Sequence, residues 1–392
     1  SAAAGVRIAS IDMLRGLVIV LMALDHVRDY FHAGAYQFDP LDPARTDAWL
    51  YATRWITHFC APTFVFLAGT SAWLQLAKGK SRAALSRFLV TRGLWLVVLE
   101  FTIVSFGWAF AFPYMIFLQV IWAIGWSMVI LAALIWLPRV AVLAIGAGVI
   151  AGHGLLNPIQ PEQLGAFAQL WIFLHDPGPV IVAGQPVGFA LYPVLPWAGI
   201  MAFGYGLAAW FAAPANVRDR NFLILGASMI AAFAVLRVIN QYGDNQPWSE
   251  QSDALTTAMS FMNLTKYPPS LMYVCATLGP MLLLVPALER MRGPLAGWLR
   301  TYGAVPLFAY VLHIYIVHAL AMAANAAAGR DVAGFHNFIV NVFTNPAALA
   351  GTGFDLWVAY LAWAVVLAIL FPLCAWFARV KRTRKDWWLS YL

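Results

Sequence analysis

The stretch Ile11-Asp-Met-Leu-Arg-Gly-Leu-Val-Ile-Val-Leu-Met-Ala-Leu-Asp25-His26 places ionisable side chains inside an apolar segment. Continued to residue 32, the segment is long enough to cross a bilayer as a helix. Ionisable groups at membrane depth are costly and usually mark a reaction centre or an ion path. Arg15 and His26 are 11 residues apart, which is close to three helical turns, so both side chains share one face about 16 Å apart. The segment therefore predicts a membrane helix with a cation near one surface and an imidazole near the other.

The composition extends this prediction to the whole chain. Of the 392 residues, 62% are hydrophobic and 10% are charged, which lies far outside the average for soluble domains. We therefore expect an all-α, polytopic integral membrane protein that forms a single domain over residues 1–392. Ten membrane-spanning helices are predicted over residues 11–32, 54–77, 88–110, 113–137, 139–156, 191–212, 221–240, 267–288, 303–325 and 355–378. The region 139–190 leaves room for a re-entrant segment as an alternative.

The basic residues predict the orientation of these helices. Eighteen of the 24 lysines and arginines lie in six segments, at 1–15, 78–92, 138–140, 213–220, 289–302 and 379–392. These segments alternate with four long connections that contain few basic residues, at 33–53, 157–190, 241–266 and 326–354. We therefore expect both termini in the cytoplasm. The basic C-terminal segment is expected to contact anionic lipid headgroups, and nucleic-acid binding is not expected.

His26 has two acidic neighbours on its own helix. Asp29 follows at i+3 on the same face, so its carboxylate is expected within reach of the imidazole. There it would fix the ring tautomer and raise the basicity of the ring, as the orienting acid does in a catalytic triad. Asp25 points about 100° away and is expected to face a neighbouring helix. The alternative for Asp25 and His26 is a buried structural pair.

Other spans carry further ionisable groups at membrane depth. They are Arg54 and His58 at the start of the second span, Glu100 in the third, Lys266 before the eighth, and His313 and His318 in the ninth. An interfacial hydrogen-bonding role competes with catalysis for the histidines, and extension towards the lipid headgroups competes with ligand binding for the cations. No metal site is expected, because the cysteines and histidines lack metal-ligand spacing.

Several segments together resemble a known family. They are Ser10–Gly16, Met22–His26, Thr53–His58, Pro62–Gly69, Pro196–Tyr205, Lys266–Leu271 and Pro306–His313. In them the chain resembles a bacterial membrane family related to the catalytic domain of heparan-α-glucosaminide N-acetyltransferase. The spacing from Arg15 to His26 also resembles the first-helix motif of the broader transmembrane acyltransferase superfamily.

The resemblance implies transfer of an acyl group, expected to be acetyl, from cytoplasmic acyl-CoA to an acceptor on the outer side. Acetyl-CoA or another acyl-CoA would be the donor, and the acceptor would be a glycan or a lipid-linked sugar that is O- or N-acetylated. The resemblance further implies a location in the bacterial inner membrane, in contact with membrane lipids. It leaves open whether the protein forms a homodimer. The alternative is a proton-coupled transporter or flippase that uses the intramembrane Asp, His and Glu residues.

The resemblance also assigns roles to residues. His26 is expected to act as general base or as nucleophile, with Asp25 or Asp29 behind it. The acyl-CoA is expected to bind Arg15, with Arg54 and Lys266 as further candidates; Arg54, His58 and His313 are alternatives as donors to the developing oxyanion. The lysosomal heparan-α-glucosaminide N-acetyltransferase departs from this pattern. In that enzyme an asparagine stands at the position of His26, and the reactive histidine lies in the first luminal loop. Only His32 lies near that loop in this chain.

Overall fold

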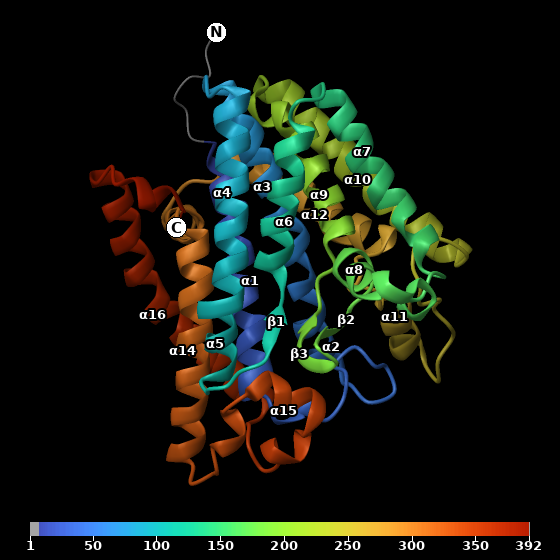
Figure 1. Cartoon of the computed structure of the whole chain (residues 1–392), viewed down its shortest axis with the longest axis vertical. Coiled ribbons are helices and arrows are strands. Elements are labelled where there is room, and N and C mark those ends of the chain that lie inside the picture. The colour runs from blue at the N-terminus through green and yellow to red at the C-terminus, as the bar shows by residue number, and fades with distance from the viewer. Residues whose placement is uncertain (1–7, 392) are drawn as a thin grey trace.

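The computed structural model describes residues 8–391, and they form a helical bundle with one small sheet (Figure 1). Residues 1–7 belong to the basic N-terminal segment predicted to be cytoplasmic, and they and residue 392 lie outside the described residues. Within residues 8–391, eight helical segments are long and apolar enough to cross a membrane. The chain is therefore a polytopic integral membrane protein.

All ten predicted spans correspond to helices. They are α1 (Ala9–Phe31), α2 with η2 and α3 (Ala48–Ile56, Thr57–Phe59, Cys60–Ala77), α4 with the π-helical turn η3 and α5 (Arg82–Leu99, Glu100–Val104, Ser105–Ala109), α6 (Val120–Leu134), α7 with η4 (Arg139–Gly152, His153–Leu156), α9 with η6 (Val194–Leu207, Ala208–Ala212), α10 (Ala215–Ile239), α12 (Leu271–Arg290), α14 (Pro306–Ala327) and α16 (Leu356–Thr383). Two of them, α1 and α6, are not among the eight apolar segments. Helix α1 carries five charged side chains, and α6 has only 15 residues.

The remaining elements lie between these helices. They are η1 (Ala33–Tyr36), η5 (Pro161–Phe167), α8 (Ala168–Leu174), α11 (Ala254–Met262), α13 (Pro294–Gly303), η7 (Ala333–Phe335), α15 (Phe338–Thr344), η8 (Pro346–Leu349) and η9 (Trp387–Tyr391), with the strands β1 (Ile116–Leu118), β2 (Gly178–Val182) and β3 (Gln185–Ala190). Strand β3 is central, parallel to β1 and antiparallel to β2. The region predicted as an alternative re-entrant segment thus contains short helices and a hairpin.

Local sequence explains where several helices begin. The carboxylate of Asp47 accepts hydrogen bonds from the backbone N–H groups of Trp49 and Leu50 at the start of α2. Ser81 and Ser270 cap α4 and α12 in the same way. Such side chains satisfy N–H groups that have no partner within the helix. The prolines in the first turns of α13 and α14 occupy positions where no backbone donor is needed.

Helix α1 lies at the centre of the bundle, in contact with α3, α12, α13, α14 and α16. Its apolar side chains, among them Met13, Val18 and Val27, are buried. By contrast, α10 and α16 expose apolar side chains such as Val238 and Leu361, as expected for helices that face lipid. The central position of α1 explains how a helix with five charged side chains is kept in an apolar bundle: its polar groups face other helices.

Glycines allow two close contacts between helix backbones. A Cβ atom at Gly16 of α1 would overlap the carbonyl oxygen of Leu299 in α13, and one at Gly303 would overlap that of Asp12. Helices α3 and α9 meet in the same way, at Gly69 and Gly204. Small residues that let backbones approach closely are typical of helix packing in membranes. The first turns of α1 are therefore held directly against α13.

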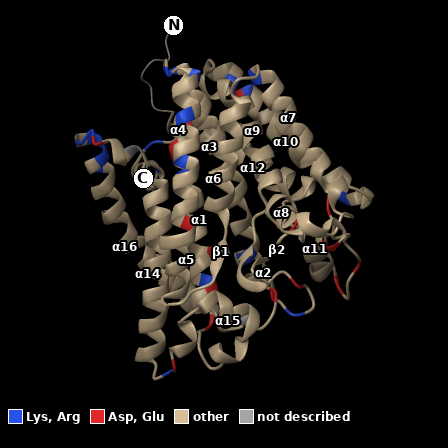
Figure 2. Ribbon diagram, in the orientation of Figure 1, with Lys and Arg blue, Asp and Glu red and all other residues tan. Residues whose placement is uncertain are grey.

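Charged residues are distributed unevenly over the two ends of the bundle. Figure 2 shows that lysines and arginines gather at the end where α1 begins, while acidic residues line loops at the opposite end. Helix α16 ends at the basic side as well (Figure 1). We call the basic side the inner end and the opposite side the outer end. Assignment of the inner end to the cytoplasm stays a prediction from the basic residues.

Candidate functional site

A cavity of about 310 Å³ lies at the inner end, enclosed by α1, α3, α4, α6 and α14. Basic side chains line it near the inner surface, namely Arg15, Arg92 and Lys381. Val120 and Tyr310 line its deep end. The cavity thus changes from a cationic opening to an apolar floor, an arrangement that suits a ligand with an anionic head and an apolar arm.

A second cavity of about 660 Å³ adjoins the first and shares Arg15, Ser71 and Gln75 with it. Its wall also contains Lys78 and Arg218. Because Arg15 lines both cavities, an anionic ligand that occupies either one would lie against its guanidinium group. The structure thus places Arg15 at a position suited to ligand binding.

The geometry of Arg15 is set by helices α1 and α3. Its Nη1 lies 3.5 Å from Oδ1 of Asp12, one turn earlier on α1. Its Nη2 donates a hydrogen bond to Ser71 Oγ on α3. The Arg15 side chain is 21% exposed, and that exposed part lines the cavities. A guanidinium group at the wall of a cavity can bind a phosphate or carboxylate through two parallel hydrogen bonds.

His26 is paired with His313 of α14. Nδ1 of His26 lies 2.6 Å from Nε2 of His313, and the two rings are nearly parallel, with an interplanar angle of 12° and centroids 4.9 Å apart. Nδ1 of His313 lies 3.1 Å from the carbonyl oxygen of Ala309. That carbonyl can only accept, so the proton of His313 is on Nδ1 and its Nε2 accepts from Nδ1–H of His26. The lone pair of His26 Nε2 then remains available to a ligand.

The deep end of the inner cavity lies close to this histidine pair. Tyr310, which lines the cavity floor, precedes His313 by one helical turn on α14, and their ring centroids are 5.8 Å apart. Trp108 of α5 packs its ring edge-on against His26, with centroids 4.9 Å apart. Both Arg15 and His26 therefore face α14 and the continuous helix α4–α5. This agrees with the shared helical face predicted from their spacing.

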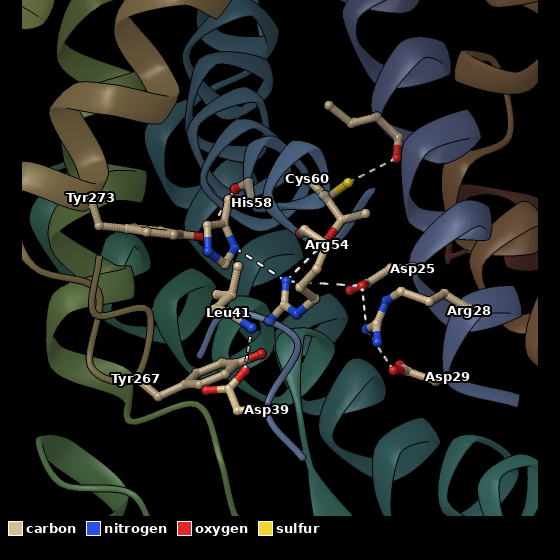
Figure 3. Close-up of polar contacts among 12 residues, drawn as sticks. Asp25, Arg28, Asp29, Asp39, Leu41, Arg54, His58, Cys60, Tyr267 and Tyr273 are labelled. Carbon is tan, nitrogen blue, oxygen red and sulfur yellow. Dashed lines mark hydrogen bonds and ion pairs between the residues drawn. The ribbon is translucent and has the colours of Figure 1, made fainter. Parts of the chain in front are cut away.

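A cluster of buried and partly exposed charges, which includes Asp25 next to His26 in the sequence, lies at the outer end of α1 (Figure 3). Nη2 of Arg28 lies 3.0 Å from Asp25 and 2.6 Å from Asp29. Nη1 of Arg54, from α2, lies 3.9 Å from the same oxygen of Asp25. The Arg28 side chain is only 4% exposed. Buried charges of this kind are stable only when they are paired.

His58 extends the cluster towards α12. Its Nδ1 accepts a hydrogen bond from Nη1 of Arg54 at 3.2 Å, so its proton is on Nε2. That Nε2 is buried and has no hydrogen-bond partner among the described residues. The Tyr273 hydroxyl donates to the backbone oxygen of His58, and the Tyr273 ring packs edge-on against the imidazole, as Figure 3 shows. His58 therefore presents a rigidly held donor that no other group within residues 8–391 accepts.

Lys266 lies between aromatic rings at the outer end. Its Nζ is 5.1 Å from the ring centroid of Tyr267 and 5.9 Å from that of Tyr192, distances typical of cation–π contacts. Lys266 is buried, and it is close enough to act electrostatically on Asp25. It therefore belongs to the outer charged cluster.

The predicted site residues thus separate into an inner and an outer group. The inner group contains Arg15 alone; the outer group contains Asp25, His26, Asp29, Arg54, His58, Lys266 and His313. The structure does not bring Arg54 and Lys266 near Arg15 as donor-binding partners. The reason is topological. Both residues lie at the outer ends of their membrane-spanning segments, whereas Arg15 lies near the inner end of α1.

The expected contact between Asp29 and His26 is also wrong. The Asp29 carboxylate binds Arg28, and Nδ1 of His26 binds His313. Arg28 is adjacent to Asp29 in the sequence. Its guanidinium carries a full positive charge and competes with the His26 imidazole for the Asp29 carboxylate. Asp25 likewise binds Arg28 at i+3. The partner that orients His26 is therefore a second imidazole from a distant helix.

Sequence reasoning missed three residues of the site. Arg28 gave a usable signal, since it follows Asp25 at i+3 and ion pairs form at that spacing. Ser71 and Trp108 gave none, because each reaches α1 from a helix far away in the sequence.

Two other ionisable residues have structural roles. Glu100 Oε2 accepts hydrogen bonds from the backbone N–H groups of Gln119 and Trp122 at the start of α6. His318 lies 2.8 Å from the carbonyl oxygen of Gly107 and 3.0 Å from that of Phe335, and so joins α14 to its neighbours. Within residues 8–391, no group of three or more His, Cys, Asp or Glu side chains could hold a metal ion.

Comparison with known proteins places this site in a family. No curated protein matches the chain. Residues 7–241, however, match the family described as heparan-alpha-glucosaminide N-acetyltransferase, catalytic. The match includes Arg15, Asp25, His26, Arg54 and His58 and ends before α12 and α14, which supply Tyr273 and His313. The match covers more than half of the chain, and the protein belongs to this family of acetyltransferase-type membrane enzymes.

Proposed function

We propose that the protein transfers an acetyl group from acetyl-CoA, bound at the inner end, to a polar acceptor that reaches His26 from the outer end. The observation that carries the proposal is the short distance between the cavity lined by Arg15 and the His26–His313 pair. The cavity lined by Arg15 ends at Tyr310, one helical turn from the His26–His313 pair. A glycan or a lipid-linked sugar is the proposed acceptor, in line with the glucosaminide in the family description.

The two inner cavities would hold the donor. The phosphates of CoA would bind Arg15 with Arg92, Lys78 and Lys381, since guanidinium and ammonium groups pair with phosphate. The pantetheine arm would follow the increasingly apolar wall towards Tyr310. Arg15 and His26 are about 16 Å apart along α1, a span that an extended arm can cover. The thioester would then lie next to the histidine pair.

The His26 Nε2 lone pair would act on the acceptor. As general base, it takes a proton from the acceptor amine or hydroxyl while that nitrogen or oxygen forms a bond to the acetyl carbonyl carbon. The C–S bond then breaks, and the CoA thiolate takes the proton back from His26. His58 Nε2–H, which has no partner in the part of the chain that the structure describes, is the proposed donor to the developing oxyanion. Arg28 and Arg54 hold the carboxylates of Asp25 and Asp29 away from the imidazole.

The nucleophilic alternative for His26 is open to a direct test. An acetyl-imidazole on His26 would release CoA before any acceptor is present. Rapid mixing of enzyme and acetyl-CoA without acceptor would then give a burst of free thiol equal to the enzyme concentration. We propose the base role and expect no burst.

The central experiment measures acetyl transfer by purified protein in lipid nanodiscs, with acetyl-CoA and glucosamine as substrates. We expect His26→Ala to lower kcat/KM by about 10³-fold, since general base catalysis contributes 10²–10⁴-fold. His336→Ala is the control, because His336 is exposed and lies in an outer loop. Unchanged thermal unfolding of His26→Ala would show that the loss is chemical.

A binding measurement separates this proposal from transport. A ligand at 100 times its Kd stabilises the folded protein by about 2.7 kcal/mol, so saturating CoA should raise Tm. If millimolar CoA leaves Tm unchanged while a small solute raises it in a proton-dependent way, the acetyltransferase proposal is contradicted and a proton-coupled transporter is favoured. The bacterial inner membrane, with the basic end in the cytoplasm, is the proposed location.

A further inference from the structure

A separate apolar cavity is lined by Trp108, the residue whose ring packs against His26. It has a volume of about 460 Å³ and lies between α5, β1, β3 and α15. Phe117, Phe189, Val340 and Phe343 are among the apolar residues that line it. Its volume falls within the range of small-molecule sites. The function proposed above does not use this cavity.

Trp108 connects the cavity to the catalytic histidines. Its ring lines the cavity and also packs edge-on against His26 at a centroid distance of 4.9 Å. The backbone N–H of Asn337, another lining residue, donates to the carbonyl oxygen of Ala109 at 2.7 Å. Asn337 and Trp108 are therefore held close together at the wall nearest the active site.

Two buried polar atoms of these residues have no partner among the described residues. They are Nε1 of Trp108, a donor, and Oδ1 of Asn337, an acceptor. Trp108 is only 3% exposed. A buried polar group without a hydrogen bond costs about 1–3 kcal/mol, so a ligand with a polar group at this wall would remove a cost that the described residues leave.

The rim of the cavity suits the surface of a membrane. Phe343, which lines the cavity, is 66% exposed. Exposed aromatic rings are characteristic of the membrane–water interface. The cavity lies at the outer end of the bundle with α15 and the sheet (Figure 1). A molecule in the outer leaflet could therefore place its chain here without leaving the lipid.

We propose that this cavity binds the apolar tail of the acceptor, an isoprenoid or acyl chain that carries a sugar head. The inference rests on the proposed acetyl transfer and specifies its acceptor as an amphiphile. The link between tail and head would bind Trp108 Nε1 and Asn337 Oδ1. The head would then extend past Trp108 and present its amine or hydroxyl to His26.

The structure favours the acceptor's tail over the acyl chain of the donor. The donor cavity ends at Val120 and Ile121, and the tail cavity begins at Ile116 and Phe117. Between them runs β1, which is paired with β3 and fixed by a hydrogen bond from the Phe117 N–H to Ser105 Oγ at 3.3 Å. A donor acyl chain would have to cross this backbone, whereas a lipid chain can enter from the outer end.

Kinetics with two acceptors in nanodiscs tests the inference. Decyl β-D-glucosaminide carries a tail, and glucosamine does not. We expect the tail to raise kcat/KM at least tenfold. Val340→Trp, which fills the cavity, should reduce this advantage to less than twofold. Phe343→Ala removes a wall residue that is 66% exposed, and should also reduce it.

A matched control is Val365→Trp on the lipid-facing side of α16, where Val365 is 48% exposed. It adds the same side chain away from the cavity and should keep the full advantage. If Val340→Trp and Phe343→Ala keep the advantage as well, the inference is overturned. It is also overturned if decanoyl-CoA is preferred to acetyl-CoA and Val340→Trp removes that preference, because the cavity would then belong to the donor.

Photolabelling gives a readout that does not need turnover. Decyl glucosaminide with a diazirine at the end of its tail should label residues 338–344, and unlabelled decyl glucosaminide should compete. Equal competition by decanol would show a general lipid cavity and overturn the inference. Specific labelling without any acetyl transfer would contradict the proposed function and leave the binding site standing. Acetyl transfer without a tail effect would support the proposed function and overturn the inference about the tail cavity.

Discussion

Helix α1 contains the same local pattern twice, once at each end. Asp12 precedes Arg15 by three residues, and Asp25 precedes Arg28 by three residues, with ion pairs of 3.5 Å and 3.0 Å. Arg15 is 21% exposed, has a neutral hydroxyl partner on α3 and lines two cavities. Arg28 is 4% exposed and bound to a second carboxylate at 2.6 Å. The same spacing thus gives one arginine suited to a ligand and one enclosed by protein charges, and the neighbouring helices decide which is which.

The strongest test of this comparison is the matched pair Arg28→Met and Arg15→Met. Removal of one partner from a buried ion pair costs about 3–5 kcal/mol, because Asp29 loses its cation and Asp25 keeps only Arg54, at 3.9 Å. We expect Arg28→Met to lower Tm sharply and Arg15→Met to change it little. Thermal unfolding of both variants in nanodiscs measures the difference. Equal Tm values would show that the two arginines are not distinguished by their surroundings.

A smaller effect is expected on the binding of acetyl-CoA, and for this property Arg15 is the arginine that matters. Arg15→Met should raise the KM for acetyl-CoA about 10- to 100-fold with a modest change in kcat, since a hydrogen bond to a charged group contributes about 1.5–3 kcal/mol. Arg384→Met, at an exposed position near the C-terminus, is the control for loss of one cation. An unchanged KM in Arg15→Met would remove Arg15 from the donor site.

The smallest effect should come from the partner of Arg15. Ser71→Ala removes the hydroxyl that holds the guanidinium group and leaves its charge in place. We expect the KM for acetyl-CoA to rise about fivefold, equal to roughly 1 kcal/mol. Ser71→Thr keeps a hydroxyl and serves as the conservative comparison. If Ser71→Ala raised KM as much as Arg15→Met, the role of Arg15 would depend on its position more than on its charge.

The sequence predicted the helices well and the contacts between them poorly. A helix lies at each of the ten predicted spans, and eight helical segments within residues 8–391 are long and apolar enough to cross a membrane. The 11-residue spacing placed Arg15 and His26 on one face of α1. The predicted partner of His26, Asp29, was wrong. The observed partner, His313, is 287 residues away, and no local pattern marks a contact over that distance. The same holds for Trp108. Strand β1 was missed because its three residues are too few to show an alternating pattern.

The charged groups of the outer cluster were found individually, but their pairing was not. Spacing on a helix shows which side chains are neighbours, yet it does not rank competing partners. Asp29 had both His26 and Arg28 within reach, and the full positive charge of the adjacent arginine decided the contact. Arg54 was correctly placed at the outer end, but its contact with Asp25 depends on how α2 packs against α1.

The glycine contacts between α1 and α13 restrict how this protein can work. A transporter of the rocking type must separate helices to open its site alternately to each side. Here the backbones at Gly16 and Gly303 touch, so no layer of side chains lies between the helices to accommodate sliding. We therefore expect α1 to stay still through the reaction cycle. The acetyl group would then cross the membrane by passing between two fixed entrances, and only the substrates would travel.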